Sequence, residues 1–409
     1  MTLAEEIIAA HAGVDRVVPG QIATVTVDQI YLQDGNVPTI RRLFDEWGFT
    51  AVAHPERIAA VYDHSVLAAD SAISTRLRES QRFAESIGIT TFPIGRGISH
   101  VVALEEGWYR PGGLVVATDS HTCTGGVMQC LALGMGATDV LAAMLTGQTW
   151  LRVPQTRWVG VKGTPSAAAR TKDVMLYALA RFGQDPFLYR SVEWFGDWLG
   201  TLTPDAAATI ANMAVEMGAK CAFLPPGPGR TEGLRELAPP PGADPAHVLE
   251  LDVADLPPFV SRPHSPLDAV PLEDCSGQDI DYVFIGSCAN GRLEDLREVA
   301  DVLARTPVHP RVHCVVTPGS QEIYLRALET GVIETLIRAG ALVTPAGCGA
   351  CVGTQGTVPA AGDRVLTTMN RNFRGRMGSR DASIWLASPL VAACTAAYAR
   401  IPQREELPC

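Results

Sequence analysis

Short apolar stretches alternate with amphipathic stretches along most of this 409-residue chain. In the first third, an apolar run at 23–30 precedes a segment with helical spacing at 37–47, and a second apolar run follows at 59–62. Strands that alternate with helices indicate βαβ units and a parallel sheet. Small and apolar residues dominate from 125 to 150, where the pattern predicts closely packed helices.

A different arrangement begins after Pro154. The apolar spacing predicts a helix at 206–218, which places Asn212 and Glu216 at i and i+4 on one face. The segment 257–271 is rich in proline, a composition typical of a linker.

The last third shows the clearest alternation. We expect strands at 282–285 and 341–343, an amphipathic helix at 293–303, and a helical region at 320–338 that breaks at Gly331. Polar clusters fall where a strand gives way to a loop, and in open α/β sheets that edge binds ligands.

The length exceeds one ordinary hydrophobic core, and a content of 47% hydrophobic and 19% charged residues is that of a globular protein. We therefore expect an α/β protein with three domains. Their predicted limits are 1–155, 156–271 and 272–409.

The net charge of −11 limits the partners of this chain. Such a surface repels phosphate backbones and anionic lipid head groups, so we expect neither nucleic acid nor a membrane as partner. The uncharged stretch 382–399 is mostly Ala, Ser and Thr around Pro389, and it predicts a strand and a buried helix. No charged-then-apolar leader opens the sequence, and the ten cysteines lack the dense spacing of a secreted scaffold, so we expect a cytoplasmic protein.

Two cysteines, Cys348 and Cys351, follow the predicted strand at 341–343. A CxxC pair is a redox dithiol, half of a zinc site, part of an iron–sulfur cluster, or two buried thiols. No second CxxC is present to complete a four-ligand zinc site. Cys288, after another predicted strand, favours the cluster, because three thiolates leave one iron open to act as a Lewis acid. The other cysteines are interpreted as structural: Cys123, Cys130, Cys221, Cys275, Cys314, Cys394 and Cys409.

Carboxylate and imidazole groups recur at predicted strand ends in the first domain. They are Asp63, His64, His100, Asp119 and His121. A lone histidine is more often an ordinary hydrogen-bonded residue, but three in one domain indicate a proton-transfer site. Dehydration needs such an acid, because the leaving hydroxyl group must be protonated.

Three further charged side chains each have two interpretations. Glu216 is either a helix-surface charge or part of a proton relay with Asn212. Arg371 and Arg376 are either solvated charges or ligands of a carboxylate, to which their planar forks are suited. Four arginines between 371 and 380 in an acidic protein favour a small anionic ligand.

Four ordered motifs in this sequence resemble those of the aconitase superfamily. They are Asp119-Ser120-His121-Thr122, Gly286-Ser287-Cys288-Ala289-Asn290-Gly291-Arg292, Gly347-Cys348-Gly349-Ala350-Cys351-Val352-Gly353 and Asn370-Arg371-Asn372-Phe373-Arg374-Gly375-Arg376. The resemblance extends from about residue 20 to about residue 400. It is closest to the large subunits of 3-isopropylmalate dehydratase and of homoaconitase.

The resemblance implies an aconitase-like fold, with three α/β/α domains around a central cluster-binding cleft. It implies one [4Fe–4S] cluster per chain, held by Cys288, Cys348 and Cys351. The implied positions near the cluster are Asn212, Ser287, Asn290 and Asn370. The implied acid–base residues are Asp63, His64, His100, Asp119, His121 and Glu216, and the implied ligands of the substrate carboxylates are Arg371 and Arg376.

The reaction implied by the resemblance is dehydration of a 2-substituted malate and rehydration at the neighbouring carbon. The expected pair is 3-isopropylmalate and 2-isopropylmalate, in leucine biosynthesis, and the substrate class is a small di- or tricarboxylate hydroxy acid. Homoaconitase activity or another 2-alkylmalate isomerase is the alternative, because residues 28–38 and 65–68 and Ala289 depart from the usual pattern. The resemblance also implies a separate small subunit with the swivelling domain. A redox dithiol and an RNA-binding apo-protein are the alternatives from other classes.

Overall fold

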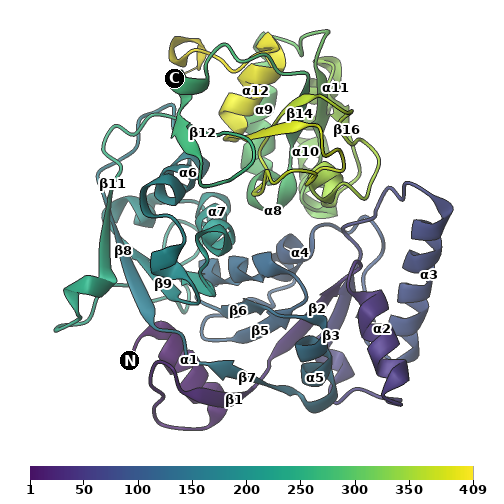
Figure 1. Ribbon diagram of the computed structural model, residues 1–409, viewed down its shortest axis with the longest axis vertical. Helices are drawn as coiled ribbons and strands as arrows, with labels where there is room; N and C mark the ends of the chain where they lie inside the picture. Colours follow the sequence, from purple (N-terminus) through teal and green to yellow (C-terminus); the bar gives the residue numbers. More distant parts are fainter. Residues whose placement is uncertain (409) are drawn as a thin grey trace.

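The computed structural model describes residues 1–408, so Cys409 and its predicted structural role lie outside the described part. The chain runs from a lower group of elements through a group at the left to an upper group, in which the C-terminus lies (Figure 1). Each group is built on its own sheet, and all three sheets contain parallel strands, which confirms the α/β expectation.

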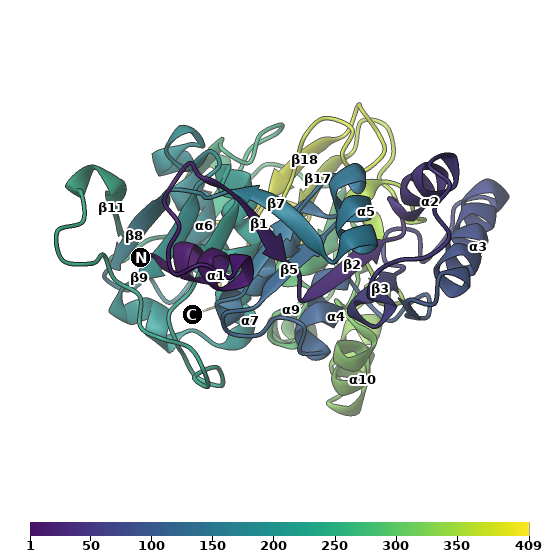
Figure 2. The same ribbon diagram turned by 90° about the horizontal axis from the view of Figure 1, so that it is seen from below.

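The first sheet has five parallel strands in the order β4-β3-β2-β5-β6. They are β2 (Gln29–Gln33), β3 (Ile58–Val61), β4 (Thr90–Thr91), β5 (Leu114–Ala117) and β6 (Leu131–Gly134). The helices around it are α1 (Leu3–Ala12), α2 (Val37–Glu46), α3 (Ser71–Ser86), α4 (Ser99–Glu105) and α5 (Ala137–Thr146). Figure 2 shows α2 and α3 side by side at one edge of this sheet. An antiparallel pair of β1 (Ile22–Thr26) and β7 (Gln148–Arg152) stands apart from it.

The second sheet has four parallel strands in the order β10-β9-β8-β11. They are β8 (Thr156–Lys162), β9 (Ser191–Phe195), β10 (Cys221–Phe223) and β11 (Val248–Asp252). Two helices accompany it, α6 (Thr171–Phe182) and α7 (Pro204–Met213). Both lie on the side that faces the upper group in Figure 1.

The third sheet has seven strands in the order β13-β12-β18-β17-β14-β15-β16. They are β12 (Phe259–Ser261), β13 (Ala269–Pro271), β14 (Tyr282–Ile285), β15 (His313–Val316), β16 (Leu342–Val343), β17 (Arg364–Thr367) and β18 (Ser383–Leu386). Its helices are α8 (Ser287–Asn290), α9 (Leu293–Arg305), α10 (Gln321–Glu329), α11 (Val332–Arg338) and α12 (Pro389–Tyr398).

Short 3-10 turns carry several of the functional residues. The turns are η1 (Pro55–Arg57), η2 (Ser120–Met128), η3 (Asp185–Phe187), η4 (Asp197–Thr201), η5 (Ala214–Met217), η6 (Pro245–His247), η7 (Leu272–Cys275), η8 (Gly349–Val352) and η9 (Arg404–Glu406). Of these, η2, η5 and η8 matter most for the site described below.

Helix α9 shows why the apolar pattern predicted the secondary structure of the last third well. Its apolar residues recur at helical spacing, and all of them are buried in the core beneath the third sheet: Leu293, Leu296, Val299, Val302 and Leu303. Burial of each such side chain stabilises the fold by about 1.5–3 kcal/mol. The predicted break at Gly331 is also confirmed, because this residue has a φ of 77° and separates α10 from α11.

Three expectations about secondary structure are wrong. The stretch 125–150 is not helical throughout, because it contains β6 and β7 beside α5; a short buried strand has the same apolar composition as a buried helix. The predicted helix at 206–218 ends at Met213, and Glu216 lies in η5. The proposed linker 257–271 contains β12 and β13, which pair with each other at the edge of the third sheet. The three-domain division stays a prediction.

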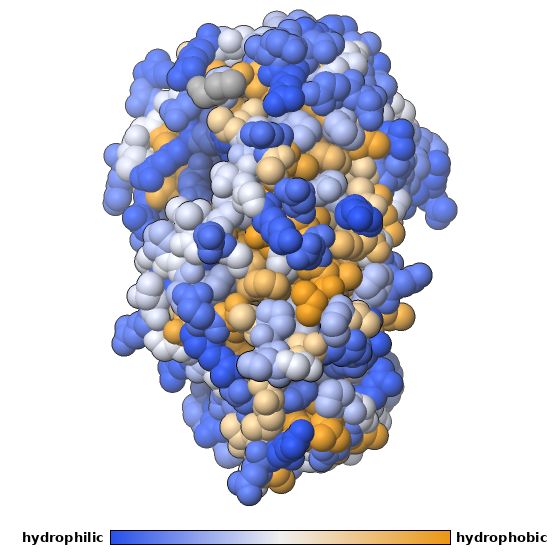
Figure 3. All heavy atoms as spheres, turned by 90° about the vertical axis from the view of Figure 1, so that its left-hand side faces the viewer, coloured by the Kyte–Doolittle hydropathy of each residue, from blue (hydrophilic) through white to orange (hydrophobic). Residues whose placement is uncertain are grey.

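The surface in Figure 3 is mainly hydrophilic, with smaller hydrophobic areas across its middle. No helix within residues 1–408 is long and apolar enough to cross a lipid bilayer. The uncharged stretch 382–399 forms β18 and α12, as expected, and α12 is buried along nearly its whole length.

Candidate active site

Cys288 is positioned by a sharp turn between β14 and the short helix α8. Gly286 has a φ of 153° and Ser287 has a φ of 80°. A Cβ atom on Gly286 would lie 2.7 Å from the carbonyl oxygen of Thr317, so only glycine fits there. The turn places Cys288 at the carboxyl end of the third sheet, as the sequence predicted.

The loop after β16 carries Cys348 and Cys351. Gly347 has a φ of 153°, and a Cβ atom there would lie 2.8 Å from the Val66 side chain. The backbone N–H of Cys348 donates to the carbonyl oxygen of Asp63 at 2.9 Å. This loop of the third sheet is therefore tied to the end of a strand in the first.

Each of the three sulfur atoms has a nitrogen nearby. Asn370 Nδ2 donates to Cys288 Sγ at 3.4 Å, and Arg376 Nη2 donates to Cys351 Sγ at 3.5 Å. Cys348 Sγ lies 3.9 Å from His64 Nδ1. Such donors stabilise thiolates, the form in which cysteine binds metals. The described cysteines are all free thiols.

The three sulfur atoms do not all lie within 4.8 Å of one another, so as they stand they do not form a site for one metal ion. Thiolates around one zinc ion stand about 3.8 Å apart, from a Zn–S bond of about 2.3 Å in tetrahedral geometry. Two sets of possible ligands in residues 1–408 have atoms all within 4.8 Å of one another, and neither contains more than one of the three cysteines. Those sets are Asp63, His64, Cys348 and His100, Asp119, His121.

A reactive dithiol does not fit well either. Of the CxxC pair, burial raises the pKa of the Cys348 thiol well above its usual value. Redox-active cysteines instead have lowered pKa values. Three free, largely buried thiols with nitrogen donors beside them are groups that could together hold a metal.

Asp63 and His64 form a tight pair at the end of β3. His64 Nδ1 lies 2.6 Å from Asp63 Oδ1, and the backbone N–H of Ser99 donates to Asp63 Oδ2 at 2.7 Å. Burial opposes both charges, but the Cys348 sulfur and the Asp63 carboxylate raise the pKa of His64 well above its usual value. Despite its own burial, Asp63 has a lowered pKa because of the His64 charge. Both shifts favour an imidazolium beside a carboxylate.

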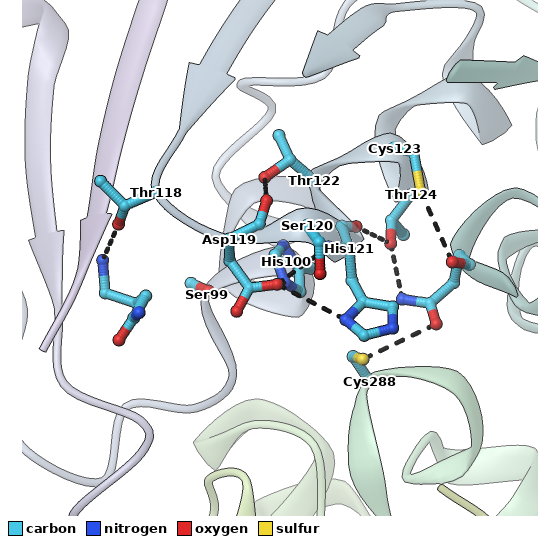
Figure 4. A network of polar contacts seen from close by, with 12 residues as sticks. Ser99, His100, Thr118, Asp119, Ser120, His121, Thr122, Cys123, Thr124 and Cys288 are labelled. Atoms are coloured by element: carbon cyan, nitrogen blue, oxygen red, sulfur yellow. Dashed lines mark hydrogen bonds and ion pairs between the residues drawn. The ribbon is translucent and has the colours of Figure 1, made fainter. Parts of the chain in front are cut away.

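Asp119 joins the other two histidines, His100 from α4 and His121 from η2 (Figure 4). Asp119 Oδ1 lies 3.0 Å from His100 Nε2 and accepts the backbone N–H of His121 at 2.8 Å. Burial disfavours the charged carboxylate, but the electrostatic interaction and hydrogen bond with His100, together with the bond from His121, hold the pKa of Asp119 well below its usual range. His64 Nε2 also lies 3.7 Å from Asp119 Oδ2, so the Asp63–His64 pair and the Asp119 network are adjacent.

Glu216 links this network to the arginine loop. Its Oε1 atom lies 3.0 Å from His121 Nε2 and accepts a hydrogen bond from Arg371 Nε at 2.8 Å. Arg371 Nη2 also donates to Ser120 Oγ at 3.1 Å. Although burial opposes it, the bond from His121 and the positive charges lower the pKa of Glu216. The interpretation of Glu216 as a surface charge is wrong, since the residue is only 4% exposed.

Asn212 and Asn370 lie beside Cys288. Asn370 Nδ2 donates to Asn212 Oδ1 at 2.8 Å, and Asn212 Nδ2 donates to Thr124 Oγ1 at 2.8 Å. Asn212 Oδ1 is 3.6 Å from Cys288 Sγ. The two amides thus connect the first cysteine with η2, which carries His121.

Ser287 and Asn290 flank Cys288 but face elsewhere. Ser287 Oγ accepts the backbone N–H of Ala289 at 3.4 Å, and Asn290 Nδ2 donates to Asp295 Oδ1 at 3.2 Å. Within residues 1–408 we find no hydrogen bond from either side chain to a cysteine sulfur. Their roles beside a cofactor stay predictions.

Sequence reasoning missed several residues of the network. Asp34 Oδ1 accepts the backbone N–H groups of Asp63 and His64 at 3.2 and 2.8 Å. Its position just after a predicted strand was the available signal. Tyr31 OH lies 2.7 Å from His100 Nδ1 and 2.6 Å from Tyr109 OH. Both tyrosines look like ordinary core residues in the sequence, so no signal marked them.

Three sheets with parallel strands, two loops of the third sheet that present three thiols, and a facing network of carboxylates and imidazoles define a class: an α/β protein with a candidate metal site and acid–base groups. The chain belongs to the aconitase family, because the model of the Aconitase family (aconitate hydratase) matches residues 5–235 and 273–399. This membership confirms the resemblance of the motifs and the aconitase-like fold.

Curated relatives match the chain along its whole length. The 3-isopropylmalate dehydratase large subunit of Desulfitobacterium hafniense is 39% identical, over 100% of this chain and 99% of its own. The probable methanogen homoaconitase large subunit of Methanothermobacter thermautotrophicus is 41% identical, over 99% of this chain and 98% of its own. Among solved structures, the holo-form of aconitase X from Thermococcus kodakaraensis shares the fold, with a TM-score of 0.54 at 14% identity, over 90% of this chain and 88% of that chain.

Proposed function

We propose that this chain is the large, catalytic subunit of a hydro-lyase that isomerises a 2-substituted malate by dehydration and rehydration. The expected reaction interconverts 3-isopropylmalate and 2-isopropylmalate, in leucine biosynthesis. One observation carries the proposal: the Asp63–His64 pair, the Asp119 network and Arg371 meet the three cysteines in one place. Full-length relatives named as large subunits of 3-isopropylmalate dehydratase support the choice of reaction.

We propose one [4Fe–4S] cluster as the cofactor, with Cys288, Cys348 and Cys351 as its ligands. When bound, the cluster supplies an open iron, a Lewis acid for the substrate hydroxyl and carboxylate groups. The three free thiols and their nitrogen donors support this assignment.

The residues of the chain supply the proton transfers and the carboxylate ligands. His64 is charged and is oriented by Asp63, which binds its Nδ1 atom. Its Nε2 atom donates the proton to the leaving hydroxyl group. Asp119, bound to His100 and His121, keeps a negative charge opposite His64. Arg371 and Arg376 have the planar forks that bind carboxylates, and Glu216 holds Arg371 in place.

Residues that depart from the family pattern meet beside His64. A pocket of about 400 Å³ is lined by Asp34, Gly35, Pro38 and Ser65, which belong to segments 28–38 and 65–68, the two segments that differ from the usual family pattern. Ile73, Leu77 and Val352 add apolar walls, and Arg76 adds a positive charge. The identity of the substituent on the malate therefore needs a substrate panel that includes alkyl and carboxyalkyl groups.

A second subunit belongs to the proposal. The relatives at 39% and 41% identity match this chain along nearly its whole length, and both are named large subunits. We propose that a small subunit completes the site in the cytoplasm, and that neither nucleic acid nor a membrane is a partner.

The test combines metal analysis with an activity assay. Anaerobically prepared protein is expected to contain about four iron and four acid-labile sulfide per chain. The Cys288→Ser variant is expected to lose them, whereas Cys394→Ser, which changes a buried cysteine of α12, is expected to keep them. With the small subunit, the wild type is expected to turn over 3-isopropylmalate or another 2-substituted malate. Zinc, or thiols without metal, would refute the proposal.

A further inference from the structure

Lys172 is a fully buried lysine that sequence reasoning did not single out. It is the second residue of α6 and has an exposed fraction of 0%. Its Nζ atom donates to the carbonyl oxygens of Thr368 and Met369 at 2.9 and 2.7 Å, and it lies 3.4 Å from Asn370 Oδ1. All three donors of the ammonium group thus point to the segment that follows β17.

This placement is unfavourable for a lysine on two counts. The first turn of a helix carries partial positive charge, so a cation there is disfavoured. A buried charge also costs free energy unless an opposite charge compensates it. None of the ion pairs formed within residues 1–408 includes Lys172, and carbonyl and amide oxygens are its hydrogen-bond acceptors there. Retention of a charge at such a position points to a compensating anion that these contacts do not supply.

The groups whose negative charge acts on Lys172 are Cys288, Glu216, Asp295 and Asp173, and the cysteine is the one that Asn370 joins to it. Burial lowers the pKa of Lys172 to about 8, and the Cys288 sulfur is the strongest influence that opposes this shift, followed by Glu216. Asn370 connects the two directly, because its Oδ1 atom faces Lys172 and its Nδ2 atom donates to Cys288 Sγ. Lys172 therefore lies one side chain away from a metal-ligating thiol.

Resting on the proposed function, we propose that Lys172 is a positioning residue and the buried counter-cation of the cysteine centre. It holds the segment after β17 so that the Asn370 amide reaches Cys288, and its charge stabilises the more negative state of the cluster. The second domain predicted from the sequence thereby contributes to a centre whose ligands all come from the third. Removal of the charge should make the cluster harder to reduce, since buried charge is one determinant of the reduction potential of such clusters.

The experiment compares midpoint potentials of anaerobically prepared, full-length protein, followed by the electron paramagnetic resonance signal of the reduced cluster. Lys172→Gln removes the charge and keeps a hydrogen-bond donor, and Lys172→Arg keeps the charge. Lys220→Gln is the matched control, because Lys220 is a part-buried lysine that donates to one carbonyl oxygen, that of Gly134. We expect a more negative potential for Lys172→Gln alone, and wild-type values for Lys172→Arg and Lys220→Gln.

The possible outcomes separate the two proposals. A wild type without iron and sulfide refutes the proposed function before any variant is compared. A wild type with the cluster, and equal potentials for wild type and Lys172→Gln, refutes the role of Lys172 alone, even if the melting temperature falls. A negative shift in Lys172→Arg as large as that in Lys172→Gln also refutes it, because the charge is then not the cause. If Lys172→Gln does not retain a cluster, Lys172→Arg decides: a full cluster at the wild-type potential supports the proposal, and any other result overturns it.

Discussion

The Nδ1 atom of His64 lies 2.6 Å from the Oδ1 atom of Asp63, whose side chain is fully buried. The backbone N–H of Ser99 occupies the other oxygen of this carboxylate at 2.7 Å. The negative charge of the Asp63 carboxylate, held at the end of β3 by this hydrogen bond, orients the imidazole ring of His64 and favours its protonated form. This geometry is what an acid for a leaving hydroxyl group requires.

Replacement of Asp63 by asparagine should therefore impair proton transfer. We expect kcat of the complete enzyme to fall by about 10²- to 10⁴-fold, the usual contribution of general acid catalysis. The alkaline limb of the pH–rate profile should also move to lower pH, because the acid must be protonated and the raised pKa of His64 depends partly on the Asp63 charge. Steady-state kinetics over a range of pH measure both effects.

The control uses another Asp–His pair of the chain. Asp28 Oδ2 lies 2.9 Å from His11 Nε2, and within residues 1–408 neither side chain has a hydrogen bond to Cys288, Cys348 or Cys351. Asp28→Asn should leave kcat and its pH profile at wild-type values. Equal losses in the two variants would contradict the role assigned to the Asp63–His64 pair.

The sequence predicted most of this site because the relevant signal is local. A thiol, an imidazole or a guanidinium group placed where an apolar strand ends is visible in the chain, and parallel strands bring such ends to one edge. Cys288, Cys348 and His64 were found in this way, and the structure brings them to one place. Strand β14 and helix α9 were also predicted closely, since their apolar spacing is unambiguous.

The residues that were missed depend on contacts between distant segments. Lys172 and Tyr31 become special only when the fold brings them to Asn370 and His100, which are 198 and 69 residues away. The end of α7 at Met213 was missed for a similar reason, because the residues after it have no strong helix breaker before Gly218. Tertiary contacts override a weak local preference at such places.

Asp119 should make stability depend on pH. Its folded pKa lies well below the unfolded value of about 3.9, so the stability it contributes is present above about pH 4 and is lost as pH falls through the folded pKa. The difference in urea midpoint between wild type and Asp119→Asn should be largest near neutral pH and should shrink below about pH 4. Urea unfolding of both proteins without the cluster, at several pH values, measures it. A difference that stays constant with pH would count against a charged Asp119.

Arg371 should be more sensitive to substitution than its neighbour Arg374. Arg371 donates to Glu216 at 2.8 Å and to Ser120 at 3.1 Å. Arg374 is exposed, and its contacts are a long hydrogen bond of 3.4 Å to the Arg380 carbonyl oxygen and one of 3.2 Å with His264 Nε2. Lysine lacks the planar fork, and a lost charged hydrogen bond costs about 1.5–3 kcal/mol.

We therefore expect Arg371→Lys to lower kcat/KM by about ten- to hundredfold. Arg374→Lys, a matched control from the same loop, should stay within about twofold of the wild type, as surface substitutions usually do. Kinetics of both variants with the small subunit test this. A similar loss in both would show that the whole loop, and not the Arg371 contacts, binds the substrate.

Gly126 should be essential for the packing that carries the acid–base residues. It lies in η2, the turn that contains Ser120 and His121, and a Cβ atom on it would lie 1.4 Å from the carbonyl oxygen of Ala222 in β10. That oxygen belongs to a sheet strand and cannot move aside as a flexible side chain does. The overlap must therefore displace η2 from the second sheet.

We expect Gly126→Ala to destabilise the chain by about 1–3 kcal/mol or more, the range for overpacking of a core. Gly356→Ala is the control, because a Cβ atom there would meet nothing within 4 Å, and it should change stability by less than about 0.5 kcal/mol. Urea unfolding curves of the two variants without the cluster measure the difference. Since η2 positions His121, any folded Gly126→Ala enzyme should also lose activity, and wild-type stability of this variant would show that η2 packs differently from the structure described.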